Sequence, residues 1–200
     1  MKRINSICVG LFLLCPTARG QSDFCLTARD GFQAGITRYI YEDSQLNIWV
    51  CSSTGLYRWD GAMLRYASSV SYGETGPLLT RGVNRIYQDS QGNYWLGTAD
   101  DGILKYVVRA DSLLHIPVLV TQHGNMTRCW DIIEDHDGLW ISGNGGLLNI
   151  SLDGGGQTFY AYVLESHGTS GPIIRAIMQD PDHDDLLWVA GTFGLAEFSK

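Results

Sequence analysis

The sequence contains four copies of one pattern at a nearly constant period. In each copy a short apolar strand ends in Asp, a polar turn follows, a second strand carries Trp, and a Gly precedes a third apolar piece. The repeated positions are Asp43, Asp89, Asp135 and Asp180; Trp49, Trp95, Trp140 and Trp188; and Gly55, Gly102, Gly146 and Gly194. Successive Asp residues lie 46, 46 and 45 residues apart, and successive Trp residues 46, 45 and 48. A fixed period of this length indicates a repeat architecture.

A period near 45 residues with several strands per unit predicts an all-β fold, the β-propeller, whose blades are four-stranded sheets of about that length. The recognisable blade signatures lie near 36–61, 82–106, 127–150 and 173–198, within propeller repeats that span 21–200. β-rich runs at 113–120 and 158–164, and a weaker one at 63–66, supply further strands. No segment has helical periodicity, so we expect no helix. We expect the four blades to form an open arc that is part of a larger ring.

Residues 1–20 have the features of a signal peptide. Lys2 and Arg3 precede an apolar run from Ile7 to Leu14, and small residues stand at Ala18 and Gly20. The run is too short to cross a bilayer, and Cys15 is a poor lipidation site because Leu14 precedes it. We expect cleavage near Gln21 and export to the periplasm.

The exported chain is strongly acidic. Loss of the signal peptide removes three basic residues, Lys2, Arg3 and Arg19, and no acid, so the net charge changes from −7 to −10. An acidic surface repels phosphate backbones and anionic lipids, so we expect this segment to bind neither nucleic acid nor membrane.

Three cysteines remain after cleavage, namely Cys25, Cys51 and Cys129. An odd number cannot pair completely within one chain. Cys51 occupies the position of Gly97, Ser142 and Ala190 in the other copies, where a small residue follows the Trp strand. Buried free thiols are therefore favoured over a disulfide or a metal site.

The residues that recur in every copy have structural explanations. Each Trp is expected to pack between neighbouring blades, and each Asp to accept backbone N–H groups in the turn that follows it. Each repeated Gly is expected to adopt a turn conformation that other residues avoid. Recognition in a propeller is instead expected at positions that differ between blades.

Four candidate ligand-binding residues stand five residues before the repeated Asp positions: Arg38, Asn84, Trp130 and Arg175. They lie at the start of the strand that we expect to be innermost in each blade. Arg and Asn offer forked donors to sugar hydroxyls or carboxylates, and Trp offers a stacking face. Salt bridges and packing between blades are the competing explanation for the same residues.

The sequence does not indicate an enzyme, a cofactor or a metal site. The five histidines share no repeat position, and no Gly-rich phosphate loop ends in Lys. Residues 180–185 are densely acidic, but they lack the spacing of a calcium loop and are expected to form a solvated hairpin tip. A propeller hydrolase or lyase remains an alternative, which would need a His and acids from different blades to converge.

The first copy resembles the two-component regulator propeller repeat of bacterial hybrid two-component proteins. Its order is Asp30-Gly31-Phe32, the strand 37–43, the Trp49 strand and the run Thr-Gly-Leu-Tyr-Arg-Trp-Asp-Gly at 54–61. The second copy matches best, with Gly97-Thr98 after the Trp, whereas the third has Ser142-Gly143-Asn144 and lacks the Thr. The resemblance covers residues 24–200.

The resemblance implies an N-terminal, extracytoplasmic sensing segment of a signalling protein with a histidine kinase and a response regulator, and a glycan as ligand. The expected partners are an oligosaccharide or another small ligand, and further copies through propeller edges or a homodimer. Because the 200 residues hold neither kinase residues nor a membrane segment, we expect a fragment of a longer sensor. The alternative is a free-standing exported propeller that binds a glycan or a protein.

Overall fold

The computed structural model describes residues 26–33, 35–66, 82–107, 112–116, 126–152, 156–161 and 173–200. The expected signal peptide, Cys25 and the ends of the runs at 113–120 and 158–164 lie outside these ranges. Within the described ranges, no helix is long and apolar enough to cross a bilayer.

Within the described ranges, fifteen strands form four separate antiparallel sheets, each built from strands that are consecutive in sequence. Blade 1 consists of β1 (Thr37–Glu42), β2 (Ile48–Ser52), β3 (Gly55–Trp59) and β4 (Leu64–Tyr66). Blade 2 consists of β5 (Val83–Gln88), β6 (Tyr94–Thr98), β7 (Ile103–Val107) and β8 (Ser112–Ile116). Blade 3 consists of β9 (Cys129–Asp135), β10 (Gly138–Gly143), β11 (Gly146–Ile150) and β12 (Gln157–Ala161). Blade 4 consists of β13 (Ile174–Gln179), β14 (Leu186–Gly191) and β15 (Gly194–Ser199).

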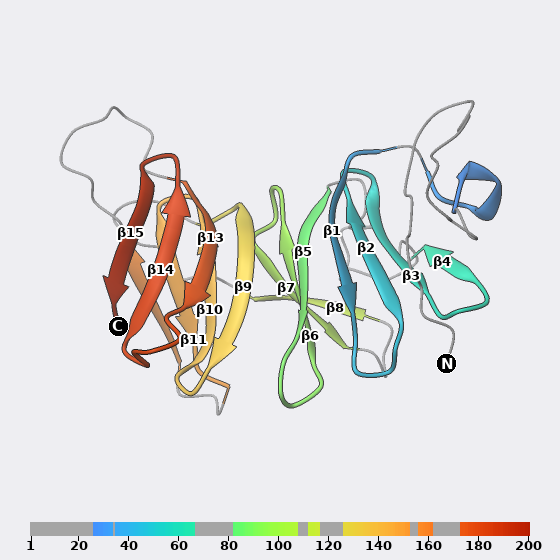
Figure 1. Cartoon of the computed structure of the whole chain (residues 1–200). Helices are drawn as coiled ribbons and strands as arrows, with labels where there is room; N and C mark the ends of the chain where they lie inside the picture. The colour runs from blue at the N-terminus through green and yellow to red at the C-terminus, as the bar shows by residue number, and fades with distance from the viewer. Residues whose placement is uncertain are drawn as a thin grey trace.

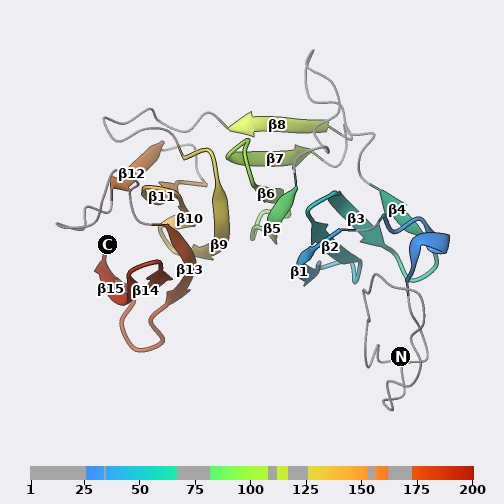
Figure 2. The same cartoon turned by 90° about the horizontal axis from the view of Figure 1, so that it is seen from above.

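The blades stand side by side in an open arc, which confirms the predicted β-propeller architecture (Figures 1 and 2). Seen from above, β1, β5, β9 and β13 are the inner strands, and β4, β8 and β12 lie on the outside of the arc (Figure 2). The turns that follow the four inner strands all lie at one end of the arc, at the bottom of Figure 1. We call this end the turn end, and the end at which the inner strands begin the start end.

The apolar core lies between successive blades. Trp49 is 2% exposed and packs with Tyr94 of blade 2, the two rings lying 5.3 Å apart. Trp95 and Trp140 pack in the same way against blades 3 and 4. Trp188 is half-buried, because no further blade covers that face in the described part of the chain. The repeated Trp is thus the residue that joins each blade to the next one.

The described ranges contain no α-helix, as expected, but a short turn of 3-10 form stands at their start. A 3-10 turn, η1 (Ala28–Asp30), begins after Thr27, whose hydroxyl accepts the N–H of Arg29 while Asp30 accepts the N–H of Thr27. This capping box satisfies the free N–H groups of a turn too short to show periodicity. Phe32 then packs on Tyr57, with ring centroids 4.7 Å apart, on the face of blade 1 opposite Trp49.

The repeated Asp has a second role that the sequence did not indicate. Besides backbone N–H groups of the turn, Asp43, Asp89 and Asp180 accept the indole N–H of the Trp in their own blade, at 2.7, 2.7 and 2.6 Å. In blade 1 the same carboxylate also accepts the hydroxyl of Tyr94, at 2.7 Å, and so links two blades. Each of these hydrogen bonds fixes an indole that would otherwise bury an unpaired donor.

Blade 3 breaks this pattern. Its turn is one residue shorter, so Asp135 pairs with Gly138 within the sheet and cannot reach the indole of Trp140. The Nε1 atom of Trp140 is buried without an acceptor in the described part of the chain. The Asp135 carboxylate instead binds the ammonium group of Lys200 from the end of blade 4.

Replacement of the repeated Trp by Phe should destabilise the protein more in blade 2 than in blade 3. Trp95→Phe removes a hydrogen bond to a buried carboxylate, whereas Trp140→Phe removes a donor that has no acceptor. Both lose similar volume, so we expect Trp95→Phe to lower the free energy of unfolding by about 2 kcal/mol more than Trp140→Phe. Urea unfolding of the two variants measures this difference, and equal losses would contradict it.

The repeated glycines do not all act alike. Gly55, Gly102 and Gly194 have φ values of 138°, 66° and 103°, where other residues are strained. Gly146 was predicted to be the same, but in blade 3 the positive φ belongs to Gly145. Gly146 is needed for space, because a Cβ atom there would lie 2.1 Å from the carbonyl oxygen of Tyr160.

Candidate functional site

The four candidate ligand-binding residues are the extra residues of four β-bulges. In β1 the register skips Arg38, and β5, β9 and β13 skip Asn84, Trp130 and Arg175 at the same place. A bulge leaves one residue unpaired and re-aims its side chain. The chain therefore presents these residues at the start end of the inner strands, where neighbouring blades meet.

Two of the four, Arg38 and Asn84, form hydrogen bonds that hold blades 1, 2 and 3 together. The guanidinium of Arg38 donates to the side-chain oxygen of Asn84. The Asn84 amide group donates to the carbonyls of Thr98 and Cys129, at 3.2 and 2.7 Å. Asn84 is 5% exposed, and both of its amide hydrogens are already donated. Arg38 and Asn84 therefore hold neighbouring blades together, as the competing explanation for these residues predicts.

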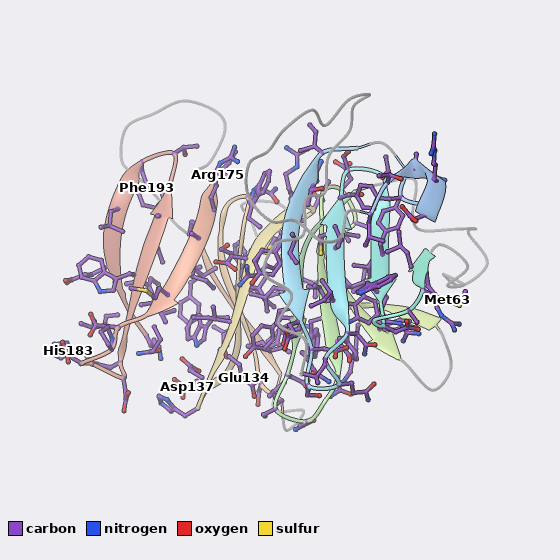
Figure 3. The ribbon with its side chains drawn as sticks, turned by 45° about the vertical axis from the view of Figure 1, so that its right-hand side comes forward. Met63, Glu134, Asp137, Arg175, His183 and Phe193 are labelled. Carbon is purple, nitrogen blue, oxygen red and sulfur yellow. The ribbon has the colours of Figure 1, made fainter. Side chains whose placement is uncertain are left out.

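The other two face each other across blades 3 and 4. The guanidinium carbon of Arg175 lies 4.5 Å from the centre of the Trp130 ring. Arg175 is exposed and Trp130 is half-buried, and the indole nitrogen has no acceptor in the described part of the chain. In Figure 3 Arg175 lies at the start end with Phe193, far from Glu134, Asp137 and His183. This pair combines an aromatic face with a charged donor at the rim.

Sequence reasoning missed a second row of residues, one position after the bulges. There Arg85 stacks on Tyr39, with 3.6 Å between the guanidinium carbon and the ring centre, and its Nε lies 2.9 Å from Asp131. Asp131 also accepts the backbone N–H of Ile177, at 3.1 Å. Tyr39, Arg85 and Asp131 share one repeat position, so reading the next column of the repeat would have found them.

Burial changes the pKa of Asp131 and of two cysteines in the inner part of the arc. Burial raises the pKa of Asp131, and the neighbouring Arg85 only partly opposes this rise. Burial likewise raises the pKa of the thiols of Cys51 and Cys129, which are both unpaired and buried. Neither thiol is a nucleophile at neutral pH, since the thiolate is the reactive form.

The turn end offers no catalytic arrangement among the residues described. His136 and His183 are exposed and lie beside Asp137 and Asp180, at 3.3 and 3.1 Å, within their own turns. Within the described ranges one group of three residues could approach a metal ion, namely Asp135, His136 and Asp137. Asp135 is already bound to Lys200, so this group is not a prepared metal site.

Comparison with known proteins agrees with this architecture. Residues 77–100, which include the first two strands of blade 2, match the family model described as two component regulator propeller. No curated protein matches the chain by sequence.

Two solved structures show the same fold. The extracellular domain of the hybrid two component system BT3049 from B. thetaiotaomicron superposes with a TM-score of 0.66 at 19% identity, over 87% of this chain and 24% of that chain. YCF48 from Cyanidioschyzon merolae superposes with a TM-score of 0.52 at 18% identity, over 82% of this chain and 51% of that chain. The chain thus spans about a quarter of the first relative and half of the second. The chain thus has the β-propeller fold, and within it residues 77–100 match the two-component regulator propeller repeat.

Proposed function

We propose that the chain is the extracytoplasmic, ligand-sensing segment of a hybrid two-component signalling protein, and that its ligand is a glycan. The observation that carries this proposal is the bulge repeated in all four inner strands, which presents four side chains of three kinds at one end of the arc. The repeat family and the likeness to an extracellular two-component domain support a sensing role. The chain would bind a ligand and transmit that event without catalysis.

Trp130 and Arg175 are the proposed contacts, because Arg38 and Asn84 already bind each other and the backbone of blade 3. The half-buried indole and the guanidinium that lies over it, 4.5 Å from the ring centre, together offer a sugar an aromatic group and charged donors for its hydroxyls. Blade 4 has an apolar face that no other described blade covers, on which Met178 and Leu195 are 57% and 68% exposed. We propose that this face contacts another blade or a second copy of the chain.

Glycan binding tests the proposal. The exported chain, labelled and applied to an array of plant, microbial and animal oligosaccharides, should bind a defined set of glycans. Trp130→Leu should weaken that binding by about tenfold or more, because stacking on an aromatic face contributes on the order of 1–2 kcal/mol. Met63→Ser, at an exposed site on the far side of blade 1, is the matched control and should bind as the wild type does.

Two results would count against the proposal. Absence of binding to every glycan would contradict the glycan ligand. Equal binding by the wild type and a folded Trp130→Leu variant would contradict the site. Urea unfolding of each variant, compared with the wild type, shows that a loss of binding is not a loss of fold.

A further inference from the structure

We infer that the start end of blades 3 and 4 binds a carboxylate, with Arg175 as its anchor and Trp130 as the surface beneath it, so that the sensed saccharide is an acidic one. This inference rests on the proposed function and narrows it to a class of ligand. The argument starts from the state of the Arg175 guanidinium.

Arg175 stacks on Trp130 and is exposed, and no carboxylate pairs with it among the described residues. A guanidinium that lies over an aromatic ring keeps its N–H groups available for hydrogen bonds to another group. Those N–H groups have the geometry that binds a carboxylate through two parallel hydrogen bonds. The indole therefore holds the guanidinium ready for a planar anion.

The other arginines at the start end are already matched. Arg38 binds Asn84, Arg85 lies 2.9 Å from Asp131, and Arg128 lies 3.3 Å from Asp100 while also donating to the carbonyl of Ala99. Arg175, like Arg85, lies over an aromatic ring, but it differs from all three in having no acceptor in the part of the chain that the structure describes.

The nearest repeat position cannot supply the missing carboxylate. Asp131 follows Trp130 directly, but one of its oxygens faces Arg85 and the other accepts the N–H of Ile177 at 3.1 Å. A turn of this carboxylate toward Arg175 would break both contacts and leave a half-buried arginine unpaired. An acceptor for Arg175 has to come from outside this row.

Charge is divided between the two ends of the inner strands. Among the residues that the structure describes, the start end carries Arg38, Arg85, Arg128 and Arg175 against Asp100, Asp101 and Asp131. At the turn end stand Glu42, Asp43, Asp89, Glu134, Asp135, Asp137, Asp180, Asp182, Asp184 and Asp185, with Lys200 among them. An anion that approaches the exported chain, whose net charge is −10, is therefore directed to the start end.

Isothermal titration of the exported chain tests the inference with three probes. They are trigalacturonic acid, the neutral galactose trisaccharide of the same linkage, and citrate as a carboxylate without a sugar. Trigalacturonic acid should bind more tightly than the neutral trisaccharide, and its affinity should fall as salt rises. Arg175→Gln, which keeps hydrogen-bond donors but not the charge, should weaken it by about tenfold.

Arg128→Gln is the matched control, because it removes an exposed charge at the same end whose partner is Asp100. It should change the affinity less than twofold. Citrate binding that depends on Arg175 and equals that of trigalacturonic acid would assign the site to carboxylates in general and contradict the saccharide part of the inference.

The failure of the inference differs from the failure of the proposed function. Neutral glycans that bind through Trp130, with no effect of Arg175→Gln, would overturn the acidic ligand and leave glycan sensing intact. Absence of binding by every saccharide would overturn both. A change in oligomeric state with Arg175→Gln, without a change in affinity, would assign Arg175 to a contact between chains and overturn the inference.

Discussion

Replacement of Asp43 by alanine should lower the free energy of unfolding by about 4 kcal/mol. This is the largest loss that we expect from a single substitution in the turns of this fold. The carboxylate is 3% exposed and accepts the indole N–H of Trp49 and the hydroxyl of Tyr94, both at 2.7 Å. It also accepts backbone and side-chain N–H groups of Asn47. Burial opposes ionisation of Asp43, but these hydrogen bonds outweigh it and hold the pKa below its usual value.

The expected loss of stability is large because two buried hydrogen-bond donors remain without an acceptor. Asp43→Ala leaves the buried donors of Trp49 and Tyr94 without an acceptor, and each such donor costs about 1–3 kcal/mol. Tyr94→Phe keeps the aromatic ring against Trp49, removes only the hydrogen bond from the hydroxyl to Asp43, and should cost about 1 kcal/mol. Urea unfolding, with Asp100→Ala as an exposed control, measures all three. A loss for Asp43→Ala no larger than that for Tyr94→Phe would contradict this role of the carboxylate.

Replacement of Lys200 by methionine should lower the free energy of unfolding by about 3 kcal/mol. The side chains of Lys200 and Asp135 are 7% and 5% exposed, so the ion pair is shielded from water. The ammonium group also donates to the side-chain oxygen of Gln179 and the carbonyl of Asp184, at 2.7 and 2.6 Å. Its loss leaves the Asp135 carboxylate buried without a counter-charge between blades 3 and 4, with the backbone N–H of Asp137 still donating to it at 2.8 Å.

A double variant distinguishes the effect of the Lys200–Asp135 ion pair from the effect of side-chain packing. In Lys200→Met with Asp135→Asn no charge remains buried, so part of the lost stability should return. Arg128→Met breaks the exposed pair with Asp100 and should cost about 0.5 kcal/mol or less. If Lys200→Met costs no more than Arg128→Met, the ion pair does not join blades 3 and 4.

The period of the sequence predicted the architecture because each blade needs the same few residues. Trp49, Trp95 and Trp140 fill the space between neighbouring sheets, and that requirement returns with every blade. Asp43 and Asp89 pair with a Trp six positions later, a spacing that the sequence shows but that alone does not reveal a hydrogen bond.

The exceptions could not be predicted because each depends on contacts between distant residues. The turn of blade 3 is short by one residue, and only the sheet register shows that Asp135 then turns away from Trp140. Its replacement partner, Lys200, lies 65 residues later and outside the repeated pattern.

The candidate site was predicted in part. Counting back from the repeated Asp located the four bulge residues, because a bulge is inherited with the repeat. The same count could not separate Arg38, which binds Asn84, from Arg175, which stacks on Trp130. The two arginines differ because each contacts a different side chain of the neighbouring blade.

The size and location of the native product test the central claim, the sensing segment of a signalling protein, most directly. An antibody raised against residues 26–200 is applied to separated soluble and membrane fractions of the cells that make the protein. The proposed function predicts one membrane-bound band several times larger than 22.1 kDa. A soluble band slightly below 22.1 kDa would contradict it and favour a free-standing exported propeller.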